Sequence, residues 1–212
     1  MMRKYIRYAL YVLVFIVSTP ARSGTYEDFF QAVQRDDGST VAALLARGTD
    51  PNSRDPQGQT ALHLALRDQS PRVVQALWAS SLLDVNAINE SGETPLMMAA
   101  LRGDLESAQR LLARGAKVHK AGWSPLHYAA TGGEPKIVEL LLDRGAPIDA
   151  PSPNRSTPLM MAARYGAEAN VDLLLARGAD KRLRNDLGLD ASAFARLGGR
   201  EFLIARLEPP SR

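Results

Sequence analysis

Residues 94–100 read T-P-L-M-M-A-A, and the same seven residues recur at 157–163. Close variants of this motif, T-A-L-H-L-A and S-P-L-H-Y-A-A, begin at Thr60 and Ser124. In chain order, the four motif starts are 34, 30 and 33 residues apart. A second motif, L-L-A-R-G or L-L-D-R-G, ends at Gly48, Gly115, Gly145 and Gly178. Two motifs that recur together in one frame predict a tandem repeat of about 33 residues.

Each repeat contains the start and stop residues of two short helices. In the unit that begins at Thr94, threonine is a preferred helix cap, and the proline after it fits the first helical position. The apolar run 96–101 predicts a first helix closed by Gly103, and Asp104 can cap a second helix that ends at Gly115. Neither helix is long enough to be stable alone, so the pairs must stack. The side chains expected in the middle of the resulting core are Leu111, Leu112, Leu140 and Leu141.

These motifs resemble the ankyrin repeat, whose signature is a T-P-L-H-x-A helix start in a period of about 33 residues. The resemblance extends from Tyr26 to Leu207. It implies an all-α solenoid of stacked helix–turn–helix pairs with finger loops, forming a single domain over residues 24–212. The expected parts are an N-terminal cap at 26–54, repeats at 55–88, 89–119, 120–151 and 152–184, a C-terminal cap at 185–207 and a tail at 208–212.

The chain departs from the repeat pattern at two places. Ser80 and Ser81 stand where the other repeats have the glycine that ends the second helix. From Gly115 to Ser124 there are only 9 steps, whereas the corresponding intervals elsewhere are 12. One finger loop therefore lacks three residues. Because the fingers of ankyrin-like proteins line a concave binding surface, the resemblance implies an indentation of that surface at this finger.

The concave surface supplies the candidate binding residues. In the ankyrin pattern, the two residues after the A-A of each first helix point into the concave groove. This pattern and the shortened finger select five partner-binding candidates, Leu101, Arg102, Trp123, Arg164 and Tyr165. Tryptophan, tyrosine and arginine are the residue types that dominate interface energetics. The alternative for Trp123 is structural, with the ring folded back over apolar surface that the missing finger residues leave bare.

Residues 1–23 have the three-part layout of a secretory signal peptide: a basic start, a short apolar run at 8–17, and small residues at a cleavage site. Cleavage after Ser23 makes Gly24 the new N-terminus, and cleavage after Ala21 is the second choice. The apolar run is much shorter than the roughly 20 residues that a membrane span needs, so we expect cleavage rather than a retained anchor. We therefore expect general-route export to a bacterial periplasm, with the extracellular space as the alternative, and no stable membrane insertion of the mature chain.

Composition and charge exclude several kinds of chemistry. The chain has 212 residues, of which 45% are hydrophobic, and it has no cysteine, which excludes disulfide scaffolds, cysteine zinc sites and thiol nucleophiles. Four of its 26 basic side chains lie in residues 1–23, where there is no acid, so the remainder carries 22 basic and 23 acidic side chains. A nearly neutral body lacks the basic face that phosphate binding requires, so we expect no nucleic-acid partner.

No group of residues predicts a cofactor, a metal site or a catalytic centre. His63 and His127 lie two repeats apart, about 20 Å at the usual spacing of packed helices, so one zinc ion cannot bind both. The resemblance implies that histidines at this motif position are structural. The motifs G-x-S-x-G, H-E-x-x-H and G-x-x-x-x-G-K-[ST] are absent from the sequence. Four methionines of the repeat motif fit core packing better than a copper(I) site: Met97, Met98, Met160 and Met161.

Together these features predict a non-enzymatic protein–protein interaction module that is exported and binds another protein through its concave face. We expect the partner to be an exported protein and the chain to be a monomer. The alternative is a secreted effector that acts on host proteins. Retention in the periplasm favours the first role, and appearance in the culture medium favours the second.

Overall fold

The structure, a computed structural model, describes residues 21–208. Residues 1–20 and 209–212 lie outside the described residues, and with them almost all of the expected signal peptide. Within the described part the chain is helical, with an isolated antiparallel bridge between Arg54 and Thr60 and no strand. The predicted all-α solenoid is confirmed. None of the described helices is long and apolar enough to cross a membrane.

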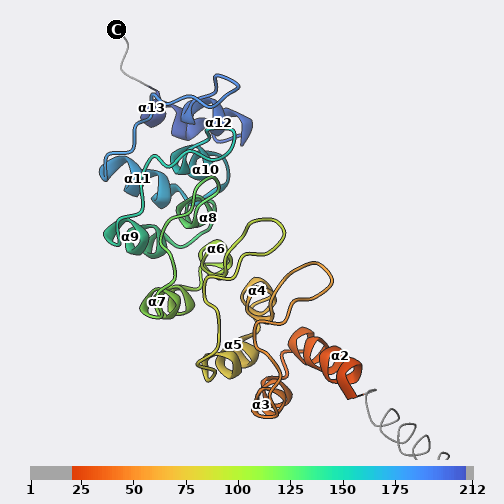
Figure 1. Cartoon of the computed structure of the whole chain (residues 1–212). Helices are drawn as coiled ribbons and strands as arrows, with labels where there is room; N and C mark the ends of the chain where they lie inside the picture. Colours follow the sequence, from red (N-terminus) through yellow and green to blue (C-terminus); the bar gives the residue numbers. More distant parts are fainter. Residues whose placement is uncertain (1–20, 209–212) are drawn as a thin grey trace, which may run out of the picture.

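The helices follow one another in pairs along the chain (Figure 1). The first members of the pairs, the inner helices, are α2 (Ala21–Gln34), α4 (Ala61–Arg67), α6 (Pro95–Arg102), α8 (Pro125–Thr131), α10 (Pro158–Tyr165) and α12 (Ala191–Leu197). The second members, the outer helices, are α3 (Gly38–Ala46), α5 (Pro71–Trp78), α7 (Leu105–Ala113), α9 (Pro135–Asp143), α11 (Glu168–Ala176) and α13 (Ile204–Leu207). A short 3-10 helix, η1 (Glu201–Leu203), precedes α13.

The inner helices form one continuous row, in which each helix from α2 to α12 packs against the next. The outer helices form a second row, in which α3 packs on α5, and α9 packs on both α7 and α11. Helix α5 is not packed closely against α7, nor α11 against α13, so the outer row is interrupted at these two places. The loops before α4 and α6 project from the stack as fingers (Figure 1).

The predicted helix boundaries of the unit that begins at Thr94 are confirmed. The Thr94 hydroxyl accepts a backbone N–H of the first turn of α6 at 3.4 Å, and the Asp104 carboxylate accepts one of α7 at 2.9 Å. Gly103 and Gly115 have φ angles of 72° and 86°. This left-handed conformation favours glycine, which explains why the repeat motif places glycine at these helix ends.

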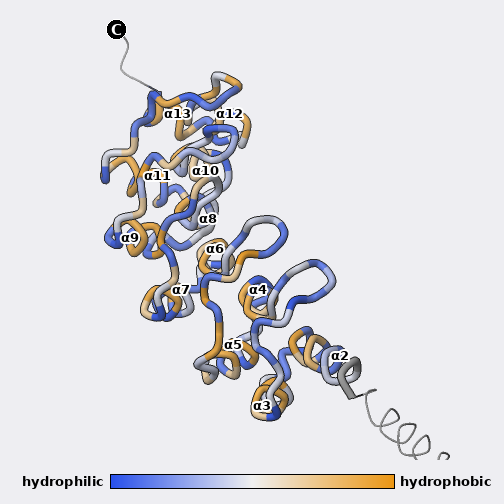
Figure 2. Tube along the Cα trace, viewed as in Figure 1, coloured by the Kyte–Doolittle hydropathy of each residue, from blue (hydrophilic) through white to orange (hydrophobic). Residues whose placement is uncertain are grey.

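The hydrophobic core lies between the two rows of helices, and the projecting fingers are largely polar (Figure 2). Leu111, Leu112 and Leu141 are buried as predicted, whereas Leu140 is only half-buried. Successive residues of a helix point about 100° apart, so a residue next to the buried Leu141 lies at the edge of the core. The core packing predicted for the methionines is confirmed for three of them, Met97, Met98 and Met160, while Met161 is half-buried.

Helix α5, which lacks the terminal glycine, is closed by an arginine of the next repeat. The Arg114 guanidinium donates to the carbonyl oxygens of Trp78 at 3.2 Å and Ser80 at 2.8 Å. The guanidinium carbons of Arg110 and Arg114 also lie 5.1 and 5.6 Å from the centroid of the Trp78 ring, within the range of a cation–π interaction. These side chains therefore connect α5 to the repeat of α7 where the two helices do not pack closely.

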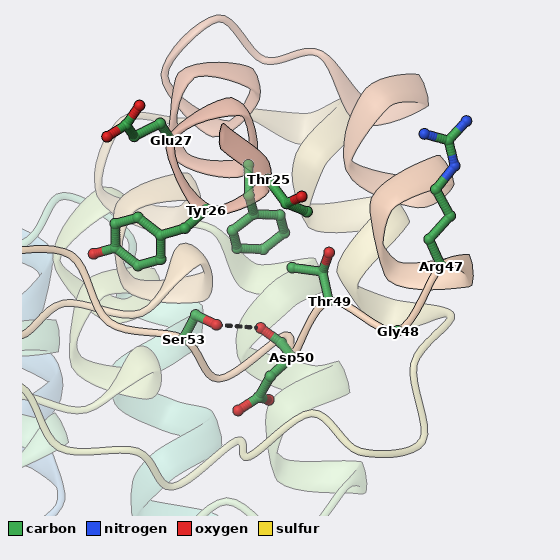
Figure 3. Close-up of a pocket in the computed structure, with 9 residues that line it drawn as sticks. Thr25, Tyr26, Glu27, Arg47, Gly48, Thr49, Asp50 and Ser53 are labelled. Atoms are coloured by element: carbon green, nitrogen blue, oxygen red, sulfur yellow. Dashed lines mark hydrogen bonds between the residues drawn. The ribbon is translucent and has the colours of Figure 1, made fainter. Parts of the chain in front are cut away.

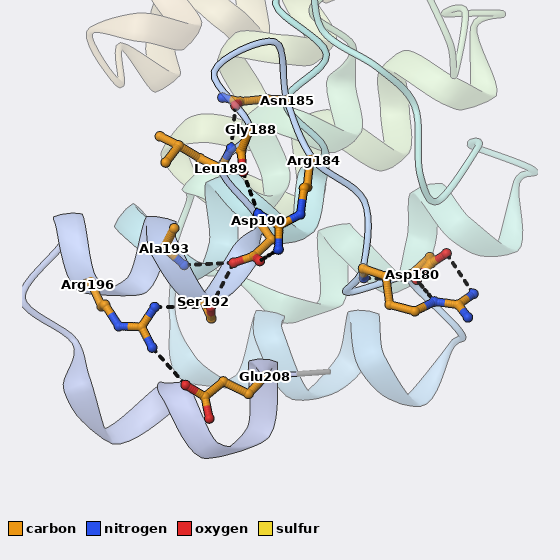
Figure 4. A network of polar contacts seen from close by, with 11 residues as sticks. Asp180, Arg184, Asn185, Gly188, Leu189, Asp190, Ser192, Ala193, Arg196 and Glu208 are labelled. Carbon is orange, nitrogen blue, oxygen red and sulfur yellow. Dashed lines mark hydrogen bonds and ion pairs between the residues drawn. The ribbon is translucent and has the colours of Figure 1, made fainter. Parts of the chain in front are cut away.

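The C-terminal cap is held by a polar network (Figure 4). Asp190 caps α12 by accepting from a backbone N–H at 3.0 Å and from Ser192 Oγ at 2.7 Å, and it pairs with Arg184 at 2.9 Å. Burial alone would raise the pKa of Asp190, but these hydrogen bonds and the Arg184 charge together lower it below its ordinary value. An ion pair of 2.7 Å between Arg196 and Glu208 ties α12 to the end of the described chain.

Candidate functional site

Two buried histidines connect the inner helices to the finger loops. His63 Nδ1 lies 2.8 Å from the N-cap hydroxyl of α4, and Nε2 donates to the carbonyl oxygen of Glu93 in the next repeat at 3.1 Å. His127 repeats this arrangement in α8, with 2.8 Å to its N-cap hydroxyl and 3.0 Å to the carbonyl oxygen of Ser156. Because a carbonyl oxygen only accepts, the ring proton is on Nε2 in both histidines.

These contacts occupy both ring nitrogens and leave neither free for a metal. Burial lowers the pKa of His63 and His127 below the ordinary value of 6.5, so both rings are neutral near pH 7. No group of three or more histidine, aspartate or glutamate side chains that could hold a metal ion occurs in residues 21–208. The two histidines are therefore structural links between repeats, as the resemblance implied.

Methionine takes the position of histidine in the other two repeats. The Sδ atoms of Met97 and Met160 accept the N–H of their N-cap threonines at 3.4 Å. A thioether has no proton to donate, so it cannot form the second bond to the next finger. The inter-repeat link is thus present from α4 and α8 but absent from α6 and α10.

The shortened finger before α8 also lacks an internal bond. The other four fingers each close with a hydrogen bond from a backbone N–H to the carbonyl oxygen four residues later: Asp55 to Gln59 at 2.8 Å, Asn89 to Glu93 at 3.0 Å, Ser152 to Ser156 at 2.9 Å and Asn185 to Leu189 at 3.0 Å. No counterpart occurs among the backbone hydrogen bonds described between Gly115 and Ser124. Like the fingers before α4 and α6, the shortened finger lies against the next finger, since a Cβ atom added at Gly122 would meet Pro153 at 3.5 Å.

A pocket of about 250 Å³ opens beside the shortened finger, between α6, α8 and α10. We call it the central groove. It is lined by Leu101, Trp123, His127, Tyr128, Thr131 and Met161. Trp123 is half-buried, and its ring stands edge-on to the His127 ring with the centroids 5.3 Å apart. The floor is therefore apolar, and one rim is an aromatic side chain held by a structural histidine.

One wall of the central groove is fixed by Tyr128. Its hydroxyl donates to Glu93 Oε1 at 2.8 Å, and Glu93 Oε2 accepts from Asn89 Nδ2 at 2.9 Å. Burial raises the pKa of Tyr128 well above 10, and the Glu93 carboxylate raises it further, so the phenol remains a donor at physiological pH. Both oxygens of Glu93 are thus engaged within the protein.

The structure brings together only two of the five residues that the sequence selected. Leu101 and Trp123 line the central groove, but Arg102 lines a separate pocket of about 390 Å³ between the starts of α5 and α7. The Arg164 guanidinium lies 4.9 Å from the Tyr165 ring centroid, and Tyr165 is 54% exposed. Neither residue lines the groove. Arg164 and Tyr165 form a stacked pair of their own at the end of α10, apart from the lining of the central groove.

Sequence reasoning missed Tyr128 and Met161 as groove residues. Both occupy the motif position directly after the histidine or methionine that bonds the N-cap. They lie three residues before Thr131 and Arg164, and residues three apart share a face of a helix. The repeat frame therefore contained the information, but the selection extended only to the residues after the A-A pair.

A pocket of about 720 Å³ lies at the start of α2 (Figure 3). Polar and apolar residues of α2 and of the segment 47–53 line it. Glu27 and Arg47 lie on opposite sides of the opening and point away from it (Figure 3). No set of polar groups converges on a common centre here, and we assign no site to this pocket.

Ion pairs connect the outer helices in the C-terminal half of the stack. Arg177, after α11, pairs with Glu139 and Asp143 of α9 at 3.0 and 2.8 Å. Arg206 in α13 pairs in the same way with Asp172 at 2.7 Å and with a second carboxylate of α11. Exposed pairs contribute at most about 1 kcal/mol each, so their main effect is to align neighbouring outer helices.

Comparison with known proteins agrees with the repeat architecture. A family model described as ankyrin repeats (3 copies) matches residues 29–121 and 103–185, well over half of the chain. The chain is 33% identical over 90 residues to the human transient receptor potential cation channel subfamily A member 1, a match that covers 42% of this chain and 8% of the channel. It is 40% identical over 83 residues to the human B-cell lymphoma 3 protein, covering 38% of this chain and 18% of that protein.

A longer match is to the ankyrin repeat protein nuc-2 of Neurospora crassa, with 34% identity over 135 residues. That match covers 64% of this chain and 10% of the fungal protein. The chain thus spans less than a fifth of the length of these curated relatives. The similarity is confined to a small part of each of them.

Proposed function

Because this chain belongs to the ankyrin-repeat family, we propose that it is an exported, non-enzymatic binding protein that recognises another protein through the concave side of its inner helices and fingers. Ankyrin repeats are protein–protein interaction modules. Export, the nature of the partner and the use of the concave side are the parts of the proposal that need to be tested.

The observation that carries the proposal is the central groove. It combines an apolar floor with a tryptophan and a tyrosine that are held by a buried histidine and a fixed carboxylate. Aromatic side chains that border a concave apolar pocket are typical of the residues that carry most of the binding energy in protein interfaces. The groove lies on three consecutive inner helices, so a bound segment can contact several repeats at once.

Affinity capture tests the proposal directly. The whole chain, carrying an affinity tag, is incubated with a periplasmic extract, and the retained proteins are identified by mass spectrometry. Matched baits carry Trp123→Ala or Phe202→Ala. Phe202 is 59% exposed on the C-terminal cap and does not line the groove, so it controls for the loss of an exposed aromatic ring.

We expect Trp123→Ala to weaken binding of the captured partner by about 2 kcal/mol, or roughly thirtyfold, with little change in melting temperature. Phe202→Ala should retain the partner. If Trp123→Ala instead lowers the melting temperature and leaves affinity unchanged, Trp123 has the structural role that the sequence left open. Failure to capture any protein specifically would contradict the proposed function.

The proposal of export depends on residues 1–23, most of which lie outside the described part of the chain. Cell fractionation and intact-mass measurement test it, and the expected product is a periplasmic chain that begins at Gly24 or Arg22. Recovery from the culture medium would support the second candidate, a secreted effector that acts on host proteins. Recovery of the uncleaved chain from the membrane fraction would contradict both.

A further inference from the structure

We infer that a proton on His127 opposes binding at the central groove, so that a partner bound there at neutral pH is released on acidification. This inference rests on the proposed function and adds regulation to the same site. It follows from the position of His127 in the groove and from the hydrogen bonds that both of its ring nitrogens make.

His127 is both a structural link between repeats and a part of the groove lining. It borders the central groove, although only 1% of its surface is exposed. An ionised side chain is stable inside a folded protein only when water or a partner group solvates it. The open groove is therefore the route by which water can solvate a protonated ring.

The neutral ring uses its two nitrogens in opposite senses. Nε2 donates to the carbonyl oxygen of Ser156 at 3.0 Å, and Nδ1 accepts from the hydroxyl and the backbone N–H of Ser124 at 2.8 and 3.2 Å. A protonated imidazole donates from both nitrogens, so the N–H of Ser124 would lose its acceptor. Ser124 is buried at the start of α8, where an unsatisfied N–H is unfavourable.

Trp123 transmits this change to the groove. It directly precedes Ser124 in the chain, and its ring stands edge-on to that of His127 with the centroids 5.3 Å apart. A movement of Ser124 or of the imidazole therefore displaces the aromatic rim of the groove. Occupation of the groove and protonation of His127 thus require different arrangements of the same three residues.

The two events are linked with a definite sign. An apolar group in the groove keeps water from His127, so the pKa of His127 is lower in the complex than in the free chain. By linkage, the proton weakens binding by the same factor by which binding opposes the proton. Binding is therefore at full strength above the pKa of the free chain, which is itself below 6.5, and weakens by at most about tenfold for each pH unit below it.

The charged residues around α8 do not offset the burial of His127. The carboxylates of Glu93 and Asp149, on the neighbouring fingers, accept hydrogen bonds from other groups. The charge of His119, on the shortened finger, lowers the pKa of His127 further. The other charged side chains on the helices packed against α8 and on the adjoining fingers are Glu90, Arg102, Lys117, Lys120, Glu134, Lys136, Glu139, Asp143, Arg155 and Arg164. Burial and a neighbouring positive charge thus both oppose a proton on His127.

His63 provides an internal control. It makes the same two contacts, at 2.8 and 3.1 Å, but does not line the groove. Burial lowers its pKa as well. A proton on His63 therefore disturbs the fold in the same way without meeting an occupant of the groove, and comparison of the two histidines separates an effect on binding from an effect on stability.

The test measures binding of N-phenyl-1-naphthylamine, an uncharged apolar fluorophore, to the whole chain at pH 7.5 and pH 4.5. Binding at the groove is the part that Trp123→Ala removes. We expect the affinity of this part to be at least about threefold lower at pH 4.5. Far-UV circular dichroism at both pH values reports whether the chain remains folded.

His127→Met removes the titrating ring and retains the N-cap contact that Met97 and Met160 make. We expect the affinity of this variant for the fluorophore to be the same at both pH values. His63→Met is the matched control, and it should keep the pH dependence of the natural chain. His119→Gln should also keep it.

Nuclear magnetic resonance of the natural chain, with nitrogen-15 in its histidines, gives a second measurement. The ring nitrogen signals report the protonation of each histidine as the pH is lowered. A saturating concentration of the fluorophore should lower the pKa of His127 and leave that of His63 unchanged, because only His127 borders the groove.

The inference is overturned if the groove affinity is equal at both pH values, if His127→Met loses affinity on acidification as the natural chain does, or if no binding depends on Trp123 at pH 7.5. Unfolding of the natural chain before His127 titrates also overturns it. Failure of the proposed function is distinguishable. Capture of a protein that needs Trp123, together with a groove affinity that does not change with pH, overturns only the regulation. A pH-dependent groove without any captured protein overturns only the assigned function.

Discussion

The fourth residue of the inner-helix motif determines whether a side-chain hydrogen bond links one repeat to the next. His63 and His127 accept a bond at their own N-cap and donate one to the next repeat. Met97 and Met160 keep only the first of these contacts. The backbone is arranged alike in both cases, so the difference between a donating imidazole and a non-donating thioether decides whether the next finger is held.

This difference predicts a pH-dependent change in stability. Burial lowers the folded-state pKa of His127, so below about pH 6.5 the unfolded chain binds a proton that the folded chain does not. The stabilising contribution of His127 is therefore present above pH 6.5 and is lost as the pH falls toward its lowered pKa. His127→Met should cost about 0.5–1.5 kcal/mol at pH 7.5 through the lost hydrogen bond, and less at pH 5. Urea unfolding of the natural chain and the variant at the two pH values measures this difference in the free energy of unfolding.

The reciprocal variant, Met160→His, provides a second measurement. The carbonyl oxygen of Leu189 occupies the position that Ser156 has for His127, so an imidazole at 160 can donate to it. We expect this variant to be more stable than the natural chain at pH 7.5 by about 1 kcal/mol and to lose that gain at pH 5. If the free energy of unfolding of either variant differs from that of the natural chain by the same amount at both pH values, the proposed role of the histidines is wrong.

At the scale of the helix, the pair α8–α9 shows what the repeat motif specifies and what it does not. Caps, terminal glycines and the buried positions Ile137, Val138 and Leu141 follow from local sequence, because each depends on a residue type at a fixed place in the repeat. Leu140 could not be placed as well, since its burial depends on how far α9 is rotated against its neighbours.

Leu141 provides the test of the core at this scale. It is fully buried in the middle of the stack, so Leu141→Ala should lower the free energy of unfolding by about 2–5 kcal/mol, through lost burial and the cavity that remains. Leu187→Ala is the matched control, because Leu187 is 76% exposed on the last finger and should change stability by no more than about 0.5 kcal/mol. Equal urea midpoints for the two variants would show that the assigned repeat frame is wrong.

The candidate site was less predictable from the sequence than the helices. The repeat pattern selects Leu101, and the shortened finger selects Trp123. Their neighbours Tyr128 and Met161 join them because three inner helices pack side by side, whereas Tyr165 lies outside the groove and stacks on Arg164. The helix face that Tyr128 and Met161 share can be derived from the repeat frame, whereas which side chains of three neighbouring helices meet in one pocket depends on the packing between the helices.

At the scale of the molecule, each repeat contacts only its neighbours, so stability is set junction by junction. The helices α5 and α7 do not pack closely, and neither do α11 and α13, but among the described residues ion pairs cross only the second of these two junctions. A pocket of about 390 Å³ separates the starts of α5 and α7, and Trp78 with Arg110 and Arg114 spans their other end. We therefore expect this junction to be the least stable in the outer row.

Arg114→Ala tests this junction. The variant loses two hydrogen bonds and a cation–π contact, which together contribute about 1–2 kcal/mol. Amide hydrogen exchange in α5 should become faster, while exchange in α9 should not change. Arg144→Ala is the control, because the Arg144 side chain makes no hydrogen bond or ion pair with the described residues. Equal acceleration in both helices, or none in either, would contradict the special role of this junction.

The interrupted outer row has a mechanical consequence. When the molecule is pulled by its two ends, the outer row should open first between α5 and α7, where only a few side chains connect the two helices. It should open later between α9, α11 and α13, where arginine–carboxylate ion pairs connect each helix to the next, and in the inner row the packing of α4 on α6 still holds the repeats together. All the helices of the central groove lie on the C-terminal side of the junction between α5 and α7. Under load, we therefore expect the N-terminal repeats to move away from the rest of the stack while the central groove keeps its shape.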